Sequence, residues 1–319
     1  MFNEKSSFNW FPGHMNKSIK EIESKISIVD LVIEIVDARS PFSTQNSLFR
    51  KLLNKRPRLI IMSKFDLADV EVTNQWFNYF LSSGNKPYLI KDKQADIYND
   101  ILKLINEMTK ENQNKQIKRG IEKPQLNVLV VGIPNVGKST VISKLSKGKT
   151  VKIGNKPGVT RGLQRIVMTP NITLIDTPGI LPSKFENETI ACNCAATNSI
   201  KLEVVPKERL ATKLMRYIYN SYPDLIENTY KINKNILRPI NYDDTFIIFE
   251  EIAKRNKFTI FDNMADVERA IELFVHDIIN NNLGRISFEK PIEISEINKK
   301  TIDETDLDFT VESDLTVEW

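Results

Sequence analysis

Residues 132–139 have the types and the spacing that suit the binding of a phosphate group. They read GIPNVGKS and fit the pattern G-x-x-x-x-G-K-[ST]. Glycines in such a loop let backbone N–H groups turn toward phosphate oxygens, the lysine adds a positive charge, and the serine hydroxyl is a ligand for Mg²⁺. The residues that we expect to contact a nucleotide here are Asn135, Val136, Gly137, Lys138, Ser139 and Thr140.

A second set of suitable residues, with the sequence DTPG, occupies residues 176–179 at the end of a β-branched run. An acid at a strand end can hold Mg²⁺ through water, and the glycine N–H can reach a γ-phosphate. Between the two sets, residues 157–161 (PGVTR) are expected to form a loop whose one hydroxyl belongs to Thr160, and this loop could order around a triphosphate. We expect Mg²⁺ ligands at Ser139, Thr160 and Asp176 and a γ-phosphate contact at Gly179. An ordinary turn and a loop threonine are the alternatives.

Residues 63–66, with the sequence SKFD, follow another β-branched run and are similar to the guanine-binding pattern N-K-x-D. The carboxylate of Asp66 can accept hydrogen bonds from N1–H and the exocyclic amine of guanine, a donor pair that adenine lacks. Lys64 can lay its aliphatic stem along the base. A helix cap is the alternative interpretation. We favour a base site at Ser63, Lys64 and Asp66.

The elements that must position these motifs alternate between short apolar runs and longer amphipathic stretches. The apolar runs predict strands at residues 31–37, 58–62, 87–90, 126–132, 165–169 and 172–176. Helical spacing predicts helices at residues 16–28, 71–82, 96–114 and 138–147. This alternation is typical of an α/β protein with a doubly wound, mostly parallel sheet, in which ligands bind at the carboxyl ends of the strands.

The chain changes character after residue 185, where strand runs disappear and Leu210, Leu214 and Ile218 show helical spacing. We expect three parts, namely a nucleotide-binding domain at 1–185, a small all-helical domain at 190–288 and a mobile acidic tail at 289–319. A polar, basic stretch at residues 112–124 is expected to join the two halves of the sheet.

Composition narrows the class of protein. With 41% hydrophobic and 27% charged residues, the chain of 319 residues is neither fully disordered nor fibrous. It has no apolar run long enough for a membrane span, its start does not resemble a signal peptide, and its two cysteines, Cys192 and Cys194, cannot build a disulfide framework. We therefore expect a cytoplasmic protein without a membrane partner.

Charge is distributed unevenly along the chain. The net charge is +4, but residues 289–319 carry −7, so the rest of the chain carries +11. A basic body suits a polyanionic partner such as nucleic acid. A general excess of lysine in the composition is the alternative explanation.

The order of the motifs is unusual, because the base motif precedes the phosphate motifs. This order, with NWFPGHM at 9–15, DARSP at 37–41, PGVT at 157–160 and LGRISF at 283–288, resembles the ribosome biogenesis GTPase A family of circularly permuted GTPases. The resemblance covers nearly the whole chain except the tail. It implies a circularly permuted Ras-like P-loop GTPase domain followed by a small all-helical domain. It also implies a monomer that binds GTP and GDP and assembles the large ribosomal subunit in contact with rRNA.

The resemblance also assigns roles in hydrolysis. Ile180 stands where many GTPases have a glutamine that orients the attacking water, and an aliphatic side chain cannot do this. The resemblance implies that His14, in a turn after Pro12 and Gly13, reaches the γ-phosphate as the catalytic residue. It further implies a K⁺ ion beside the phosphates, bound by Asn135.

Two departures from the family pattern concern the base. Ser63 lacks the amide with which an asparagine would join the base edge to the phosphate loop, so we expect weaker nucleotide affinity without loss of specificity. The loop at 91–93 offers Lys91 and Asp92 as guanine contacts but lacks the usual serine or alanine, so its contact with the guanine carbonyl is an open question.

Basic residues in the helical part are candidates for RNA contact. Lys213 and Arg216 lie three residues apart and share one face of a predicted helix, opposite an apolar stripe. A solvated charged face explains them equally well, and it is the resemblance that favours RNA. The candidates are Lys207, Lys213, Arg216, Lys254, Arg255 and Lys257.

Two other functions are compatible with the residues alone. A kinase or ATPase acting on a small molecule would also use a phosphate loop and would prefer adenine. A nucleotide-dependent binding module with negligible catalysis is suggested by Ser63 and the altered loop at 91–93. We favour a GTPase that binds the precursor of the large (50S) subunit in its GTP state and is released on hydrolysis.

Overall fold

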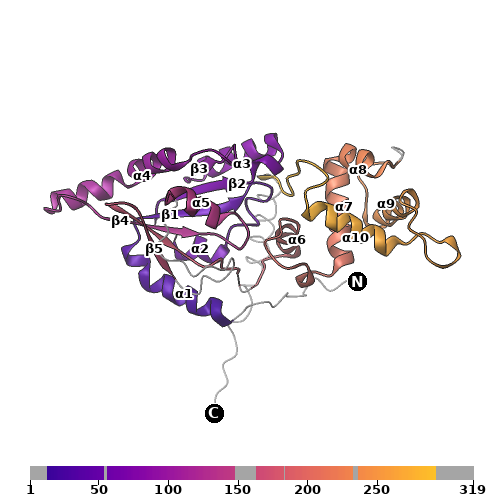
Figure 1. Cartoon of the computed structure of the whole chain (residues 1–319), viewed down its shortest axis with the longest axis horizontal. Helices are drawn as coiled ribbons and strands as arrows, with labels where there is room; N and C mark the ends of the chain where they lie inside the picture. Colours follow the sequence, from indigo (N-terminus) through magenta and orange to yellow (C-terminus); the bar gives the residue numbers. More distant parts are fainter. Residues whose placement is uncertain (1–12, 54–55, 148–162, 183, 233–235, 292–319) are drawn as a thin grey trace, which may run out of the picture.

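The computed structural model describes residues 13–53, 56–147, 163–182, 184–232 and 236–291. Within this part of the chain, six strands form one sheet in the order β3-β2-β1-β4-β6-β5 (Figure 1). All neighbouring strands pair in parallel except β5, which pairs antiparallel with β6. The prediction of a mostly parallel sheet is therefore confirmed.

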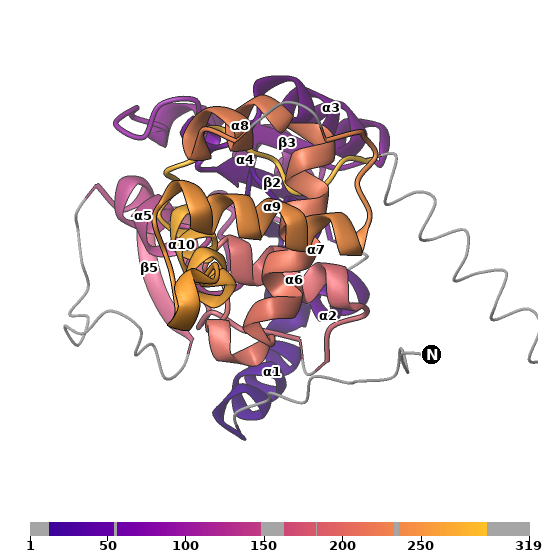
Figure 2. The ribbon, with the colours of Figure 1, turned by 90° about the vertical axis from the view of Figure 1, so that its right-hand side faces the viewer.

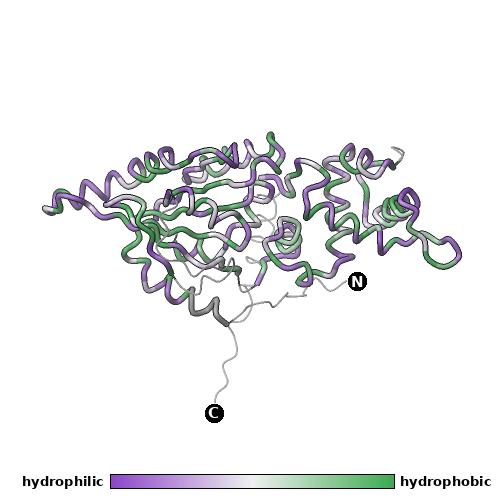
Figure 3. The backbone as a smooth tube through the Cα atoms, in the orientation of Figure 1, coloured by the Kyte–Doolittle hydropathy of each residue, from purple (hydrophilic) through white to green (hydrophobic). Residues whose placement is uncertain are grey.

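The strands form where the apolar runs lie. Their bounds are β1 Leu31–Asp37, β2 Arg58–Ser63, β3 Lys86–Leu89, β4 Leu126–Val131, β5 Gln164–Thr169 and β6 Ile172–Asp176. Every residue of β1 is buried, as expected for a central strand of a sheet that is covered on both faces. In Figure 3 the central strands are largely apolar, whereas polar and apolar residues alternate along the helices.

Helices α1 Gly13–Lys25, α2 Ser47–Leu52, α3 Val70–Ser82, α4 Tyr98–Lys118 and α5 Lys138–Leu145 accompany the sheet. The short α2 is not predicted, because six residues are too few for a helical period. The helix predicted at 96–114 is longer than expected, since α4 continues to Lys118 within the basic stretch at 112–124. No glycine or proline interrupts that helix before Gly120, which has a φ of +86°.

Pairing of β1 with both β2 and β4 brings distant motifs to one edge of the sheet. Asp37 at the end of β1 lies opposite Ser63 at the end of β2. Val130 of β4, just before the phosphate loop, lies opposite Asp176 at the end of β6. The carboxyl ends of these four strands thus place the SKFD, GIPNVGKS and DTPG motifs side by side.

Helices dominate the chain beyond the sheet (Figures 1 and 2). Their bounds are α6 Glu188–Ala196, α7 Lys207–Ser221, α8 Pro223–Tyr230, α9 Tyr242–Arg255 and α10 Val267–Ile279. Helix α7 packs against α8, α9 and α10, and the rings of Phe249 and Phe274 meet edge to face at 5.5 Å in their core. Helix α6, with the free and buried thiols of Cys192 and Cys194, contacts α7 and α10.

After α10 the chain runs back to the sheet along residues 283–291, which we call the return segment (gold in Figure 1). Its Glu289 is buried and accepts hydrogen bonds from the backbone N–H groups of Phe42 (2.6 Å) and Ser43 (3.0 Å) and from the Asn193 amide (3.1 Å). The Trp76 indole donates to the Glu289 carbonyl at 3.0 Å. Burial raises the pKa of the Glu289 carboxyl, although these hydrogen bonds act against it.

None of the helices in the ranges given above is long and apolar enough to cross a membrane.

Candidate functional site

The phosphate motif forms the connection between β4 and α5. Gly137 has a φ of +90° and immediately precedes α5, a backbone conformation that favours glycine. Asn135 also has a positive φ, of 62°. Lys138 is buried, and Ser139 and Thr140 are exposed in the first turn of α5. The loop therefore presents the N-terminus of a helix, with its free N–H groups and positive dipole end, as phosphate binding requires.

Lys138 and Asp176 form a buried ion pair, with 2.5 Å between Nζ and Oδ1. Both residues are only 8% exposed. Burial raises the pKa of the Asp176 carboxyl, and the Lys138 ammonium opposes that rise. The aspartate at the end of β6 thus holds the lysine of the phosphate loop in place.

The DTPG motif packs directly against the phosphate loop. A Cβ added to Gly179 would lie 3.1 Å from the backbone N and Cα of Pro134, so a side chain at this position would push the two loops slightly apart. The hydroxyl of Thr177 donates to the Val130 carbonyl at 3.0 Å. Ile180 is completely buried, and its carbonyl accepts from the Asn46 amide at 2.8 Å, so its side chain belongs to the core.

The SKFD motif is bonded to the phosphate loop. The hydroxyl of Ser63, the last residue of β2, lies 2.6 Å from the Val136 carbonyl and 3.0 Å from the Val36 carbonyl. Ser63 thus links the base motif to the phosphate loop through its hydroxyl, although it lacks the amide with which an asparagine is expected to make such a link. Asp66 is exposed in the 3₁₀ turn η2 Phe65–Leu67, directly after Lys64, whose φ is +56°.

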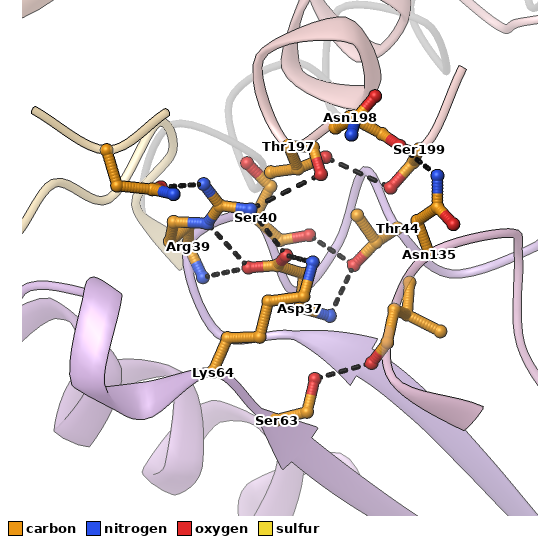
Figure 4. A network of polar contacts seen from close by, with 12 residues as sticks. Asp37, Arg39, Ser40, Thr44, Ser63, Lys64, Asn135, Thr197, Asn198 and Ser199 are labelled. Atoms are coloured by element: carbon orange, nitrogen blue, oxygen red, sulfur yellow. Dashed lines mark hydrogen bonds and ion pairs between the residues drawn. The ribbon is translucent and has the colours of Figure 1, made fainter. Parts of the chain in front are cut away.

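A buried carboxylate, Asp37, lies at the centre of the polar network in Figure 4. Its Oδ1 accepts from Arg39 Nε at 3.0 Å, and its Oδ2 lies 2.8 Å from both Arg39 Nη2 and Lys64 Nζ. Burial alone would raise the pKa of Asp37, but the guanidinium and the ammonium outweigh burial and lower it. Asp37 therefore fixes the lysine of the SKFD motif.

Sequence reasoning gave Asp37 and Arg39 no role beyond the resemblance. One signal was present, because Asp37 ends a buried strand in the same way as Asp176. Its pairing with Lys64 could not be read from the chain, since Lys64 follows a different strand, β2.

Two side chains connect this edge of the sheet to the helical part (Figure 4). Arg39 donates from Nη1 to Asn281 Oδ1 at 2.6 Å and from Nη2 to the Thr197 carbonyl at 3.3 Å. The amide of Asn135 donates to the Asn198 carbonyl at 2.7 Å. The phosphate loop is therefore in direct contact with the loop that follows α6.

The remaining candidates for nucleotide contact differ in position. Lys91 and Asp92 are exposed in the loop after β3, where Asp92 accepts from the Gln94 N–H at 2.8 Å. Lys144 of α5 donates to the Ala95 carbonyl at 2.6 Å and so holds this loop beside the phosphate-loop helix. His14 belongs to α1 rather than to a turn, but its side chain is outside the described part, as is Thr160.

Most of the basic candidates for RNA contact pair with acids or stack on a ring. Lys207 lies 2.6 Å from Glu272, and Lys254 and Arg255 each lie 2.9 Å from an acid one turn earlier in α9. Lys213 lies 3.8 Å from Glu188, and the Arg216 guanidinium lies 4.6 Å from the centre of the Tyr242 ring. Lys257 is exposed, with a φ of +56°.

A phosphate loop after a central strand, an aspartate at the next strand end and a guanine-type motif on the other side define a circularly permuted P-loop GTPase. A family model described as "50S ribosome-binding GTPase" matches residues 127–236. The chain is similar to ribosome biogenesis GTPase A of Bacillus cereus (34% identity, covering 90% of this chain and 95% of that protein) and of Bacillus licheniformis (34%, 88% and 98%). It is also similar to the solved structure of GNP-bound YlqF from T. maritima, with a TM-score of 0.54, 25% identity, and coverage of 86% and 98%.

This chain belongs to the ribosome biogenesis GTPase A family. The family expected from the motifs and the permuted GTPase fold are both confirmed.

The hydrogen bond of Ser63 leads to a first prediction. S63A removes the donor and leaves the Val136 carbonyl of the phosphate loop without this partner. We expect GDP affinity to fall about three- to tenfold, measured by titration with a fluorescent GDP analogue. Ser82, an exposed serine that bonds only within α3, provides the control S82A. Wild-type affinity in S63A would show that the bond does not support the loop.

Proposed function

We propose that this GTPase binds a precursor of the large ribosomal subunit in its GTP-bound state and leaves when GTP is hydrolysed. The observation that carries the proposal is the pair of contacts from Arg39 and Asn135 to the helical part. Through these contacts, a change at the nucleotide site can alter the helical part, which we propose to bind the partner. The names of the relatives, which assign them to ribosome biogenesis, support the choice of partner.

In this proposal one guanine nucleotide spans the edge of the sheet. Asp66 and Lys64 bind the base, with Ser63 holding their loop and Lys91 and Asp92 flanking it. The phosphates lie on the residues from Asn135 to Thr140, and Gly179 contacts the γ-phosphate. Because Lys138 is paired with Asp176, the incoming phosphates must draw the ammonium away from that carboxylate.

The residues at this edge fit a Mg²⁺ ion. Ser139 and Asp176 offer oxygen atoms, which Mg²⁺ prefers, and Asp176 already holds a cationic group. Thr160 is proposed as the further ligand. When bound, Mg²⁺ neutralises charge that develops on the phosphates. The lysine and the N-terminus of α5 supply the protein's own share of positive charge.

A residue other than Ile180 must orient the attacking water, because Ile180 is aliphatic and buried in the core. We assign this task to His14, which α1 presents near its N-terminus. Asn135, with its amide nitrogen already used by the Asn198 carbonyl, has its oxygen free for a K⁺ ion beside the phosphates.

The helical domain, proposed to span 190–288, would contact rRNA through its basic residues. Their ion pairs are mostly exposed, and exposed pairs add little to stability, so phosphates can replace the acids. We further propose that the protein is a cytoplasmic monomer. The expected start of the acidic tail at residue 289 is wrong, because Glu289 is buried and hydrogen-bonded, so we propose that the tail follows the return segment.

The proposed function is tested by co-sedimentation with precursor large subunits. The protein should co-sediment with a non-hydrolysable GTP analogue and not with GDP, and binding should weaken steeply with salt. K138A should bind poorly with either nucleotide. Equal co-sedimentation with both nucleotides would contradict the proposal. Phosphate release that subunits do not stimulate would favour the binding module without catalysis.

A separate prediction concerns His14. H14A should leave GTP affinity nearly unchanged and slow turnover about a hundredfold or more, the lower range for loss of one group that acts on the attacking nucleophile. Single-turnover phosphate release measures this, and H276A, on the exposed side of α10, is the matched control. Full turnover in H14A would reject the assignment.

The K⁺ site predicts an ion-specific rate. Hydrolysis should be faster in KCl than in NaCl at equal ionic strength, and N135A should lose this difference while still binding GDP. Equal rates of the wild-type protein in both salts would remove K⁺ from the mechanism.

A further inference from the structure

The loop that carries Asp66 is held in place by the return segment. We call residues 64–69 the base loop. It is short, begins with Lys64 in the left-handed region, and contains a single 3₁₀ turn. Such turns have poor internal hydrogen bonds and are weak on their own. Its internal backbone hydrogen bonds run from the Leu67 N–H to the Lys64 carbonyl (3.0 Å) and from the Ala68 N–H to the Phe65 carbonyl (3.2 Å).

Arg285 of the return segment forms hydrogen bonds with the backbone at both ends of this turn. Its Nε donates to the Ala68 carbonyl and its Nη2 donates to the Phe65 carbonyl, each at 2.6 Å. Its guanidinium also lies 4.7 Å from the centre of the Phe65 ring. The two carbonyls lie on either side of Asp66 in the chain. A planar guanidinium that bonds both therefore fixes the backbone from which the aspartate projects.

The neighbours of Arg285 continue the contact. Ile286 donates its N–H to the Leu67 carbonyl at 3.0 Å, and the Asp69 N–H donates to the Ser287 hydroxyl at 3.2 Å. Three consecutive residues of the return segment thus bond four residues of the base loop. Among the residues of that loop, the Asp66 side chain is left exposed toward solvent.

The return segment is itself firmly anchored, so it can act as a support. The Phe288 N–H donates to the Arg39 carbonyl at 2.8 Å, and Glu289 is buried in its cluster of donors. Arg39 in turn bonds Asp37, which holds Lys64. Lys64 and Asp66 are the residues proposed to bind the base. Each is therefore held in place through residues that also contact the helical part.

We propose that Arg285 is a positioning residue for guanine recognition and acts through Asp66. A carboxylate distinguishes guanine from other bases only if it is placed to within a fraction of an ångström. The hydrogen bonds that it accepts from N1–H and from the exocyclic amine must both be nearly straight. Without Arg285 the Ala68 carbonyl loses this donor and the Phe65 carbonyl keeps only the bond from the Ala68 N–H, so the backbone that carries Asp66 is held less firmly. The inference rests on the proposed function, in which Asp66 binds the base.

The test compares the affinities for GDP and for IDP, whose base lacks the exocyclic amine of guanine. A charge-assisted hydrogen bond from that amine to Asp66 should give a GDP preference of about tenfold or more. D66A should lose this preference. R285A should lose most of it, and R285K, which keeps the charge but not the planar fork, should show an intermediate ratio.

Arg269 provides the matched control. Its guanidinium stacks on the ring of Phe258 at 4.3 Å, also in the helical part, and among the described residues it makes no hydrogen bond to the base loop. R269A should keep the wild-type ratio of affinities. Because the ratio compares two ligands on one protein, partial unfolding of a variant lowers both affinities and leaves the ratio unchanged.

The outcomes separate the two claims. A ratio that falls in D66A but stays at the wild-type value in R285A overturns the role of Arg285 and leaves the base site intact. A ratio that D66A does not change overturns the assignment of Asp66, and the inference with it. A fall in both variants but not in R269A supports the role of Arg285.

Discussion

Parallel pairing of β1 with β2 on one side and β4 on the other is the constraint on which the nucleotide site depends. The base motif follows β2 and the phosphate loop follows β4, so the single strand between them sets their separation. The Ser63 hydroxyl then joins the two connections through the Val136 carbonyl. Permutation of the motifs in the chain is harmless for this reason, because strand neighbours, and not chain order, bring the ends of the ligand site together.

Two buried acids give this edge of the sheet its polar framework. Asp176 pairs with the lysine of the phosphate loop, and Asp37 pairs with Arg39 and with the lysine of the base motif. Buried ion pairs are costly to form and add little to stability, so their value here lies in holding cationic side chains in fixed positions. Arg39 extends this framework to the helical part, and the return segment reaches the base loop from the same direction.

Much of the fold could be predicted because its signals are local. Near-continuous apolar runs identified the strands to within one or two residues, and the phosphate and base motifs follow strand ends as expected. Helix α2 is not predicted because six residues are too short for a helical pattern. The end of α4 is predicted too early because its last turns are polar. The contacts of Asp37 with Lys64, of Arg39 with Asn281 and of Arg285 with Ala68 could not be predicted, because each joins residues that are distant in the chain. Side-chain chemistry shows that an acid or an arginine needs a partner but does not show which one.

The central claim is that Asp66 binds the base of the same nucleotide whose phosphates lie on Lys138. The most direct measurement is the affinity of D66N for xanthosine diphosphate relative to GDP, because an amide at residue 66 can accept from N1–H and donate to the carbonyl that xanthine has in place of the guanine amine. Our account predicts that the wild-type preference for GDP is reversed in D66N. A D66N protein that still prefers GDP to the wild-type extent would contradict it.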